Sequence, residues 1–126
     1  MDPAEEILLE DVFVRVRPRG TVRLHMLLEL LERLYDMPEY RDEKRGDLWD
    51  FRGSPAELDF EDLLQIRSYI RRHYDDSWSH ERTAFVIESK YQYGLARIYE
   101  KLAEDATFEL KVFEDIEEAE RWLRRP

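Results

Sequence analysis

The sequence predicts a single α/β domain over residues 1–126, in which a mixed, mostly parallel sheet of about five strands is packed against helices. The first observation behind this prediction is that the spacing of apolar residues switches repeatedly between two and about 3.6, as it does where strands alternate with helices. The second is that single helices separate most of the strands, which makes neighbouring strands parallel. The expected order is strand, strand, helix, strand, helix, strand, helix, strand, helix.

The N-terminal segment is expected to form a hairpin and then a helix. The apolar run Ile7–Leu9 and the alternating segment Val12–Val16 have the patterns of short strands, the second of them half-buried. The two acidic residues between these segments would form the turn. Thr21 is the expected N-cap of a helix whose apolar stripe covers Leu24–Tyr35, and Pro38 ends this helix.

A strand and a second helix follow the expected loop Arg41–Gly46. Leu48–Phe51 is strongly apolar and is interrupted only by Asp50, which is typical of a short strand. The next helix has two possible starts. One is a capping box at Ser54 with proline at the first helical position, and the other is an acidic start at Asp59.

The C-terminal part is expected to hold two more strands and two more helices. Thr83–Ile87 has the composition of a buried strand, and Phe108–Phe113 alternates well enough to be the last one. Capping boxes at Ser89 and Asp115 each precede apolar residues at helical spacing. The first box predicts a helix that reaches Leu102, and the second predicts the final helix.

The composition is acidic and contains no cysteine. Its 30 acidic and 20 basic residues give a net charge of −10, which disfavours general binding to duplex nucleic acid because affinity there comes from cations on phosphates. Without cysteine, disulfides, thiolate catalysis and zinc ribbons are excluded. No apolar run approaches the ~18 residues of a membrane span, and the acidic first residues do not resemble a signal peptide. We therefore expect a cytoplasmic protein.

Several segments resemble one family of small bacterial proteins. Tyr93–Tyr99 (YGLARIY) is similar to a helix start in SpoIIAA-like proteins, which are related to STAS and CRAL-TRIO domains. Leu48–Arg52 (LWDFR) is similar to their middle strand, which ends in Asp followed by Arg, and Val112–Leu123 is similar to their closing strand and helix. The resemblance implies a STAS/SpoIIAA-like fold. It favours a regulatory or protein-interaction module that has no enzymatic activity and no cofactor.

Ser54 is the residue nearest to the phosphorylated serine of anti-sigma-factor antagonists. Those proteins carry an Asp-Ser pair at the start of the second helix, whereas this chain has Asp50 and then, separated from it, Ser54. A phosphate at a helix N-terminus would be stabilised by free N–H groups and by the helix dipole. The alternative is that Ser54 simply caps the helix, and the fit of the capping box favours this alternative.

A binding site is expected at the start of the helix that follows Thr83–Ile87, because ligands of open α/β sheets bind beyond the carboxyl ends of strands. Tyr91, Tyr93 and Arg97 would line a crevice there. Arg97 would face an anion, and Gly94 would let a ligand or a partner come close. The alternative is that Gly94 allows close packing of the helix on the sheet and that Arg97 pairs with a neighbouring acid.

Asp50 and Arg52 complete the candidate binding residues, at the end of the middle strand. A carboxylate in an apolar run can have a raised pKa and act as a general acid or base, so an enzyme that uses Asp50 and Arg97 is a minor alternative. We favour a structural role, in which Asp50 accepts hydrogen bonds from the N–H groups of Gly53 or Ser54.

The segment from Val12 to Leu28 carries basic residues and no acid, although the whole chain is acidic. The arginines of this segment are Arg15, Arg17, Arg19 and Arg23. They could attract an acidic partner, an anionic headgroup or another copy of the chain, or they could protect an edge strand from aggregation. Phe13 is expected on the same face as Arg15, which favours a covered surface and a homodimer contact.

The chain offers little for a metal site or a known catalytic motif. His73 and His80 flank Asp75 and Asp76, but their spacing matches no recognised set of metal ligands. His73 is instead expected to face the carbonyl groups at a helix end. No glycine-rich phosphate loop or nucleophile motif occurs, so we expect neither a metal nor a cofactor.

Two hypotheses about function follow. The first is a non-enzymatic regulatory or protein-interaction module whose working surface lies around Ser54 and Tyr91–Arg97. The second is a carrier or sensor of a small apolar, lipid-like or anionic ligand. The aromatic residues available to line its pocket are Trp49, Tyr91, Tyr93 and Trp122. An apolar cavity beside the helix that starts at Ser89 would favour the carrier, and a flat exposed patch there would favour the interaction module.

Overall fold

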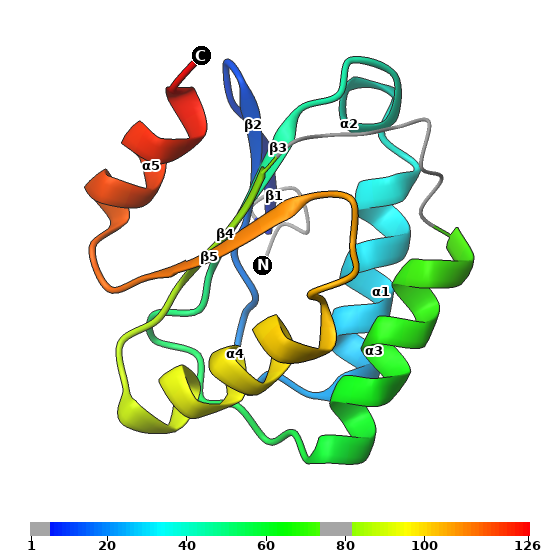
Figure 1. Ribbon diagram of the computed structural model, residues 1–126, viewed down its shortest axis with the longest axis vertical. Helices are drawn as coiled ribbons and strands as arrows, with labels where there is room; N and C mark the ends of the chain where they lie inside the picture. Colours follow the sequence, from blue (N-terminus) through cyan, green and yellow to red (C-terminus); the bar gives the residue numbers. More distant parts are fainter. Residues whose placement is uncertain (1–5, 74–81) are drawn as a thin grey trace.

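A five-stranded mixed sheet with helices on both faces forms the centre of the structure (Figure 1). The computed structural model describes residues 6–73 and 82–126. In chain order the elements are β1 (Ile7–Leu9), β2 (Phe13–Val16), α1 (Leu24–Tyr35), α2 (Pro38–Asp42), β3 (Gly46–Asp50), α3 (Phe60–His73), β4 (Arg82–Val86), α4 (Lys90–Leu102), β5 (Glu109–Phe113) and α5 (Ile116–Arg124). The predicted α/β class and the order of the strands and long helices are confirmed. The short helix α2 occupies part of what is predicted as a loop.

The strands lie in the sheet in the same order as in the chain. β1 pairs with β2 in antiparallel orientation, and β2, β3, β4 and β5 are parallel neighbours. Asp47 of β3 lies beside Thr83 of β4, and Asp50 lies beside Val86. Because side chains alternate along a strand, Asp47 and Asp50 project from opposite faces of the sheet.

Three helices share one of these faces. Each parallel strand connects to the next in the same direction across the sheet, and right-handed crossovers in one direction all lie on one face. α1, α3 and α4 occupy this face, while α5 follows the last strand and covers the other (Figure 1). Neighbouring strands are only about 4.8 Å apart, whereas packed helices need about 8–10 Å. Each of the three helices therefore cannot lie directly over the pair of strands that it connects.

α3 is the helix that is displaced from the sheet. Its backbone lies close mainly to α1 and α4, whereas the backbone of α4 comes close to β5. Figure 1 shows α3 at the outer edge of the helical layer. The space beneath α3 is bounded by large side chains of the sheet, and these do not fill it completely.

α5 packs closely against the other face. Its residues Ala119, Trp122 and Leu123 form a buried cluster with the sheet. The sheet residues in this cluster are Phe13, Leu48, Ala84, Val86 and Phe113. The guanidinium group of Arg82 also donates to the carbonyl oxygen of Trp122 over 2.7 Å, which ties α5 to β4.

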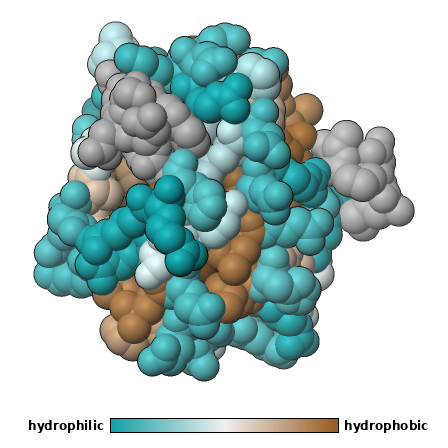
Figure 2. All heavy atoms as spheres, turned by 90° about the vertical axis from the view of Figure 1, so that its right-hand side faces the viewer, coloured by the Kyte–Doolittle hydropathy of each residue, from teal (hydrophilic) through white to brown (hydrophobic). Residues whose placement is uncertain are grey.

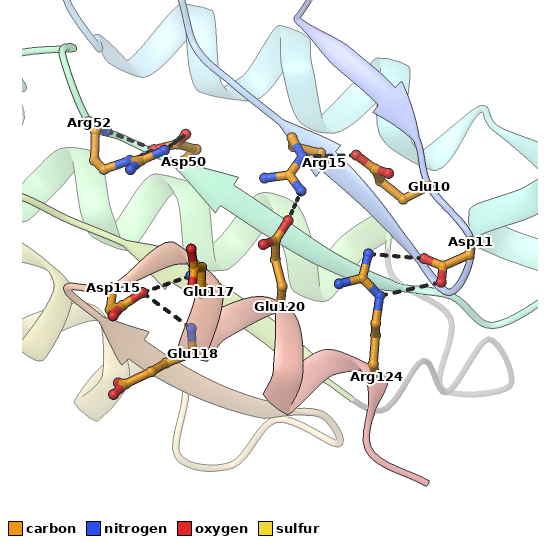
Figure 3. Close-up of polar contacts among 10 residues, drawn as sticks. All are labelled: Glu10, Asp11, Arg15, Asp50, Arg52, Asp115, Glu117, Glu118, Glu120 and Arg124. Carbon is orange, nitrogen blue, oxygen red and sulfur yellow. Dashed lines mark hydrogen bonds and ion pairs between the residues drawn. The ribbon is translucent and has the colours of Figure 1, made fainter.

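Phe13 lies on the same face of β2 as Arg15, and this face is covered, as predicted, but the cover is α5 of the same chain rather than a second copy. Its side chain is fully buried (0% exposed) because α5 of the same chain covers it. Two ion pairs also join α5 to the hairpin: Glu120 pairs with Arg15, and Arg124 pairs with Asp11 (Figure 3). Phe13 therefore gives no support to a homodimer contact.

Two of the predicted helix starts are wrong. Arg23 rather than Thr21 is the N-cap of α1, and its side chain makes no capping hydrogen bond. α3 begins at Phe60, so Asp59 is the correct start and Ser54 is not. The carboxylate of Asp59 accepts the N–H of Asp62 at 2.8 Å, and the carboxylate of Asp62 accepts the N–H of Asp59 at 3.0 Å.

One β-bridge explains both errors. Val22 pairs with Ala56. The N–H of Val22 donates to the Pro55 carbonyl oxygen over 2.7 Å, and the carbonyl oxygen of Val22 accepts the Glu57 N–H at 2.9 Å. Both segments are therefore held in extended conformation at the places where the helices are predicted to start. Capping patterns are local, so they do not reveal a pairing between residues far apart in the chain.

The other two capping predictions are confirmed. The Ser89 hydroxyl accepts the N–H of Gln92 at the start of α4, and the Asp115 carboxylate accepts the N–H groups of Glu117 and Glu118 at the start of α5.

Gly46, the first residue of β3, has no space for a side chain. A Cβ atom there would lie 2.7 Å from the carbonyl oxygen of Arg82 and 3.2 Å from Cδ2 of Leu123. The first of these atoms belongs to the backbone of the neighbouring strand and cannot rotate away. We expect Gly46→Ala to lower the free energy of unfolding by about 1–3 kcal/mol, as overpacking does. Urea denaturation measures this change, and unchanged stability would contradict the close approach of α5 and β4 at this position.

Candidate functional site

An apolar cavity of about 110 Å³ lies between the sheet and α1, α3 and α4. The sheet contributes side chains on the face opposite α5, and each of the three helices contributes its inward face. The lining residues are Leu27, Leu31, Tyr35, Tyr40, Asp47, Trp49, Phe51, Leu58, Leu63, Ile66, Ile70, Thr83, Phe85, Leu95, Ala96, Tyr99 and Phe108. The cavity lies where the displacement of α3 leaves space above the strands.

Aromatic rings form much of the wall. Phe51 lies with its ring centroid 6.2 Å from Trp49 and 5.6 Å from Phe85, and the second pair meets edge to face. Phe85 in turn lies 6.0 Å from Tyr99 of α4. These are favourable separations for aromatic pairs, so the rings support one another and keep the wall in place.

The cavity is partly open to the outside. Phe85 lies on β4, which has a neighbouring strand on each side, and yet its side chain is only half-buried. Phe51 and Leu95 are half-buried in the same way. Figure 2 looks onto the helical side of the molecule and shows hydrophobic surface between hydrophilic side chains. A small molecule can therefore contact the aromatic wall without complete opening of the core.

One corner of the cavity is polar. Asp47 is 4% exposed, and its carboxylate accepts the indole N–H of Trp49 and the hydroxyl of Thr83, both at 2.7 Å. Tyr99 faces the same corner. Burial raises the pKa of the Tyr99 hydroxyl, and the negative charge of the nearby Asp47 raises this pKa further. The positive charges of Arg67 and Arg71 act in the opposite direction. The corner thus combines a buried acceptor with a phenol that stays protonated.

The predicted site residues Asp50 and Arg52 lie on the other face of the sheet. Asp50 is 2% exposed and accepts three hydrogen bonds from Arg52 (Figure 3). The backbone N–H of Arg52 donates over 3.1 Å, and the guanidinium group of Arg52 donates to each carboxylate oxygen over 2.9 Å. The expected donors were the N–H groups of Gly53 and Ser54. Instead Gly53 donates to Glu88, and the Ser54 N–H donates to the Phe51 carbonyl.

Asp50 does not have the raised pKa that an acid–base role would use. Burial alone would raise its pKa, but the hydrogen bonds and charge of Arg52, together with the charge of Arg17, outweigh this effect and lower it. Arg97, its partner in the enzymatic alternative, lies exposed on α4, on the opposite side of the sheet. The structure does not bring these two residues together.

Ser54 is buried in a network at the carboxyl ends of the strands. Its hydroxyl donates to the Pro18 carbonyl over 2.8 Å, and the residue is 4% exposed. Gln92 of α4 donates over 2.9 Å to the carbonyl oxygens of both Ser54 and Phe51, and its own side-chain oxygen accepts the Glu88 N–H. These bonds hold the loops together where the crevice is predicted. A kinase would reach the Ser54 hydroxyl only after this network had opened.

The other predicted binding residues lie on the outer side of α4. Tyr91 and Tyr93 are exposed, and the Arg97 guanidinium lies 5.9 Å from the Tyr93 ring centroid and pairs with Glu100 at 3.0 Å. Arg97 therefore pairs with a neighbouring acid, which is the alternative that the sequence offered to an anion-binding role. A Cβ atom on Gly94 would meet nothing within 4 Å, so close packing on the sheet does not explain this glycine. These residues form an exposed surface rather than a crevice.

The predicted basic hairpin is largely neutralised within the chain. Arg15 pairs with Glu10 at 3.0 Å and with Glu120 (Figure 3), and Arg23 pairs with Glu57. Arg19 also takes part in an interaction, and Arg17 is exposed and lies near Asp50. The segment therefore presents much less free positive charge than its sequence suggests.

Of the aromatic residues proposed to line a pocket, only Trp49 lines the cavity. Tyr91 and Tyr93 are exposed, and the Tyr91 hydroxyl donates to the Leu58 carbonyl oxygen over 3.4 Å. Trp122 belongs to the cluster beneath α5. Sequence reasoning missed Asp47 because it lies just before the predicted strand Leu48–Phe51. A signal for Asp47 is nevertheless present in the sequence. Asp47, Trp49 and Phe51 occupy alternate positions, and so do Thr83 and Phe85 in the next strand, so each set lies on one face of the sheet.

His73 lies as predicted, with its Nδ1 atom 2.9 Å from the Tyr69 carbonyl oxygen at the end of α3. His80, Asp75 and Asp76 lie outside the described residues. Within the described part of the chain, no group of three or more histidine or acidic side chains could hold a metal ion. None of the helices described in residues 6–73 and 82–126 is long and apolar enough to cross a membrane.

Comparison of the chain with protein-family models finds no match, and comparisons with curated proteins and with solved structures find no similar protein. The site is therefore interpreted from its own geometry.

The ion pair of Asp50 with Arg52 predicts a dependence of stability on pH. Because the folded-state pKa of Asp50 is lowered, its contribution is present above the ordinary aspartate pKa of about 3.9 and is lost as the pH falls through the folded-state value. Arg52→Met removes this contribution and leaves a buried carboxylate. Since the Arg52 side chain is 38% exposed, we expect a moderate loss of about 1–2 kcal/mol at pH 7.

Below the ordinary aspartate pKa this loss should shrink, because protonated Asp50 does not need the cation. Urea denaturation of the wild type and of Arg52→Met across acidic and neutral pH tests the prediction. A difference in stability that does not change with pH would contradict it.

Proposed function

We propose that this protein is a non-enzymatic module that carries or senses a small apolar molecule, bound in the cavity between the sheet and α1, α3 and α4. The cavity itself is the observation that carries the proposal. Its wall is aromatic and aliphatic apart from one polar corner, and it is partly open. It also lies beside α4, the helix after Ser89, where an apolar cavity favours a carrier over an interaction module.

An empty cavity of this kind is costly for a small domain. Apolar side chains that border unfilled space lose packing contacts, and a typical domain is stabilised by only roughly 5–15 kcal/mol. A bound apolar molecule would restore the missing contacts. Apolar cavities of roughly 150 Å³ bind benzene or xenon, so a compact ligand of about one ring matches this one.

The proposal includes membership in the SpoIIAA-like family, which is related to STAS and CRAL-TRIO domains. The similarity of Leu48–Arg52, Tyr93–Tyr99 and Val112–Leu123 to segments of that family supports it, as does the order of strands and helices in a mixed sheet. CRAL-TRIO lipid-transfer proteins share this general architecture and carry apolar ligands. We also propose a cytoplasmic location, in keeping with a chain that has no cysteine.

A protein-interaction module is the second candidate function. Four large apolar side chains are exposed on α3 and α4, namely Phe60 at the start of α3 and Tyr91, Tyr93 and Ile98 along α4. Exposed apolar groups that gather on one surface favour association with another protein, and a second copy of the chain is the simplest partner.

Sedimentation equilibrium tests this second candidate. We expect a dimer for the wild type and a monomer for the double variant Tyr91→Ser/Tyr93→Ser, because the variant removes apolar area from the contact surface. The control is the cavity variant described next, which should still dimerise. A wild-type protein that stays monomeric at all concentrations would exclude self-association through α4.

Ala96→Leu tests the proposed binding of an apolar molecule. Ala96 lines the cavity from α4 and is 6% exposed, so a leucine there occupies the space of a ligand. We expect the free energy of unfolding to rise by about 1 kcal/mol, as it does when cavities are filled. The affinity for toluene, measured by calorimetry, should fall by about tenfold or more, since the site is then occupied.

Gly94→Ala is the matched control on the same helix. Its new methyl group points away from the cavity into open space, so stability should rise by up to about 1 kcal/mol while toluene binds as in the wild type. Equal toluene affinity in all three proteins, or no binding to the wild type, would contradict the proposed function. Weaker binding to Gly94→Ala alone would instead favour a site on the outer face of α4.

A further inference from the structure

Tyr99 of α4 is buried and lines the cavity, and within residues 6–73 and 82–126 its hydroxyl takes part in no hydrogen bond. We propose that the apolar ligand carries a neutral hydrogen-bond acceptor, such as the oxygen of a ketone, an ester or an ether, and that the Tyr99 hydroxyl donates to it. This inference rests on the proposed function, because it names the polar group by which the same cavity recognises its ligand.

Two contacts determine where the Tyr99 hydroxyl lies. Tyr99 is on the inward face of α4, one turn after Ala96, and both residues line the cavity. Its ring centroid lies 6.0 Å from that of Phe85 on β4, which is a favourable separation for two aromatic rings. The side chain is only 7% exposed. The hydroxyl is therefore in position beside the cavity before any ligand arrives.

The polar groups near Tyr99 bond to one another and not to its hydroxyl. Asp47 accepts the indole N–H of Trp49 and the hydroxyl of Thr83, both at 2.7 Å. Buried polar groups are nearly always hydrogen-bonded, because an unpaired donor loses its bonds to water and gains none in return. A ligand that displaces water from this part of the cavity must therefore supply an acceptor itself.

The Tyr99 hydroxyl acts as a donor at neutral pH. Burial raises its pKa, and the negative charge of Asp47 raises this pKa further. The phenol therefore stays protonated and has one O–H group to donate. A ligand that can only donate hydrogen bonds would leave this O–H unpaired, whereas an oxygen with free lone pairs would satisfy it.

The surroundings of the hydroxyl favour a neutral acceptor over an anion. The lining of the cavity is aliphatic and aromatic apart from the corner at Asp47. An ionised carboxylate loses far more hydration in such surroundings than a carbonyl or ether oxygen does. Arg67 and Arg71 of α3 lower the pKa of Tyr99, but neither belongs to the lining, and Arg71 forms an ion pair with Asp105. No cation in the lining would therefore compensate an anionic group.

Two ligands of the same shape test this inference. Acetophenone carries a carbonyl oxygen where α-methylstyrene carries a CH₂ group, and Tyr99→Phe removes only the hydroxyl of the protein. We expect acetophenone to bind about tenfold more weakly to Tyr99→Phe than to the wild type, because its buried carbonyl loses its partner. α-Methylstyrene should bind equally to both proteins, since it makes no hydrogen bond. Calorimetry measures the affinities.

The stretching frequency of the bound carbonyl reports the hydrogen bond directly. Infrared difference spectra of unlabelled and ¹³C-labelled acetophenone separate this band from the amide bands of the protein. The frequency should be lower in the wild type than in Tyr99→Phe, because donation to the oxygen weakens the C=O bond. If Tyr99→Phe does not fold, the wild-type frequency is compared with that of acetophenone in an alkane, and equal frequencies overturn the inference.

The stability of Tyr99→Phe without ligand tests whether the hydroxyl lacks a partner within the protein. Removing an unpaired hydroxyl should leave the urea midpoint unchanged or raise it. Thr83→Val is the matched control, because it removes a hydroxyl of the same cavity that donates to Asp47, and it should lower the midpoint. A midpoint of Tyr99→Phe that falls as far as that of Thr83→Val overturns the inference.

The outcomes of the ligand experiment separate this inference from the proposed function. Weaker binding of acetophenone to Tyr99→Phe, with unchanged binding of α-methylstyrene, supports both. Acetophenone that binds equally to the two proteins overturns the inference and leaves the cavity as an apolar site, and so does benzoate that binds the wild type as tightly as acetophenone. If none of the three ligands binds the wild type, the proposed function fails as well.

Discussion

Three crossover helices have to share one face of a sheet whose strands are about 4.8 Å apart, while packed helices stay about 8–10 Å apart. The strand order makes this unavoidable, because each connection advances by one strand in the same direction. α3 is consequently displaced to the outside of α1 and α4 (Figure 1). The aromatic side chains of β3 and β4 extend into the space that results without filling it. The cavity thus lies where the displacement of α3 leaves space above the strands.

β3 places one buried carboxylate on each face of the sheet, within four residues of chain. Asp50 projects toward the α5 side, where Arg52 holds it as a paired carboxylate with a lowered pKa. Asp47 projects into the cavity, where it accepts hydrogen bonds from the neutral donors Trp49 and Thr83. The α5 face is closed. The other face borders accessible apolar space, and this is why we place the function there.

Periodicity and capping predicted much of the fold, including the buried strand near Thr83–Ile87 and the helix starts at Ser89 and Asp115. These features are local, so a single sequence contains them. The burial of Phe13 beneath α5 and the bridge between Val22 and Ala56 depend on segments far apart in the chain, and local patterns could not reveal them. The candidate site was found only in part for the same reason. Trp49 was recognised, but the corner at Asp47 exists only because β3 and β4 lie side by side.

The most direct test of an accessible apolar cavity is a crystal structure of the protein under xenon pressure, because xenon enters apolar cavities without needing any polar contact. We expect a xenon atom between the sheet and α3, in contact with Trp49, Phe85 and Ala96. The close-packed cluster beneath α5 should stay empty. A structure in which these three side chains pack against α3 and exclude xenon would contradict the proposed cavity.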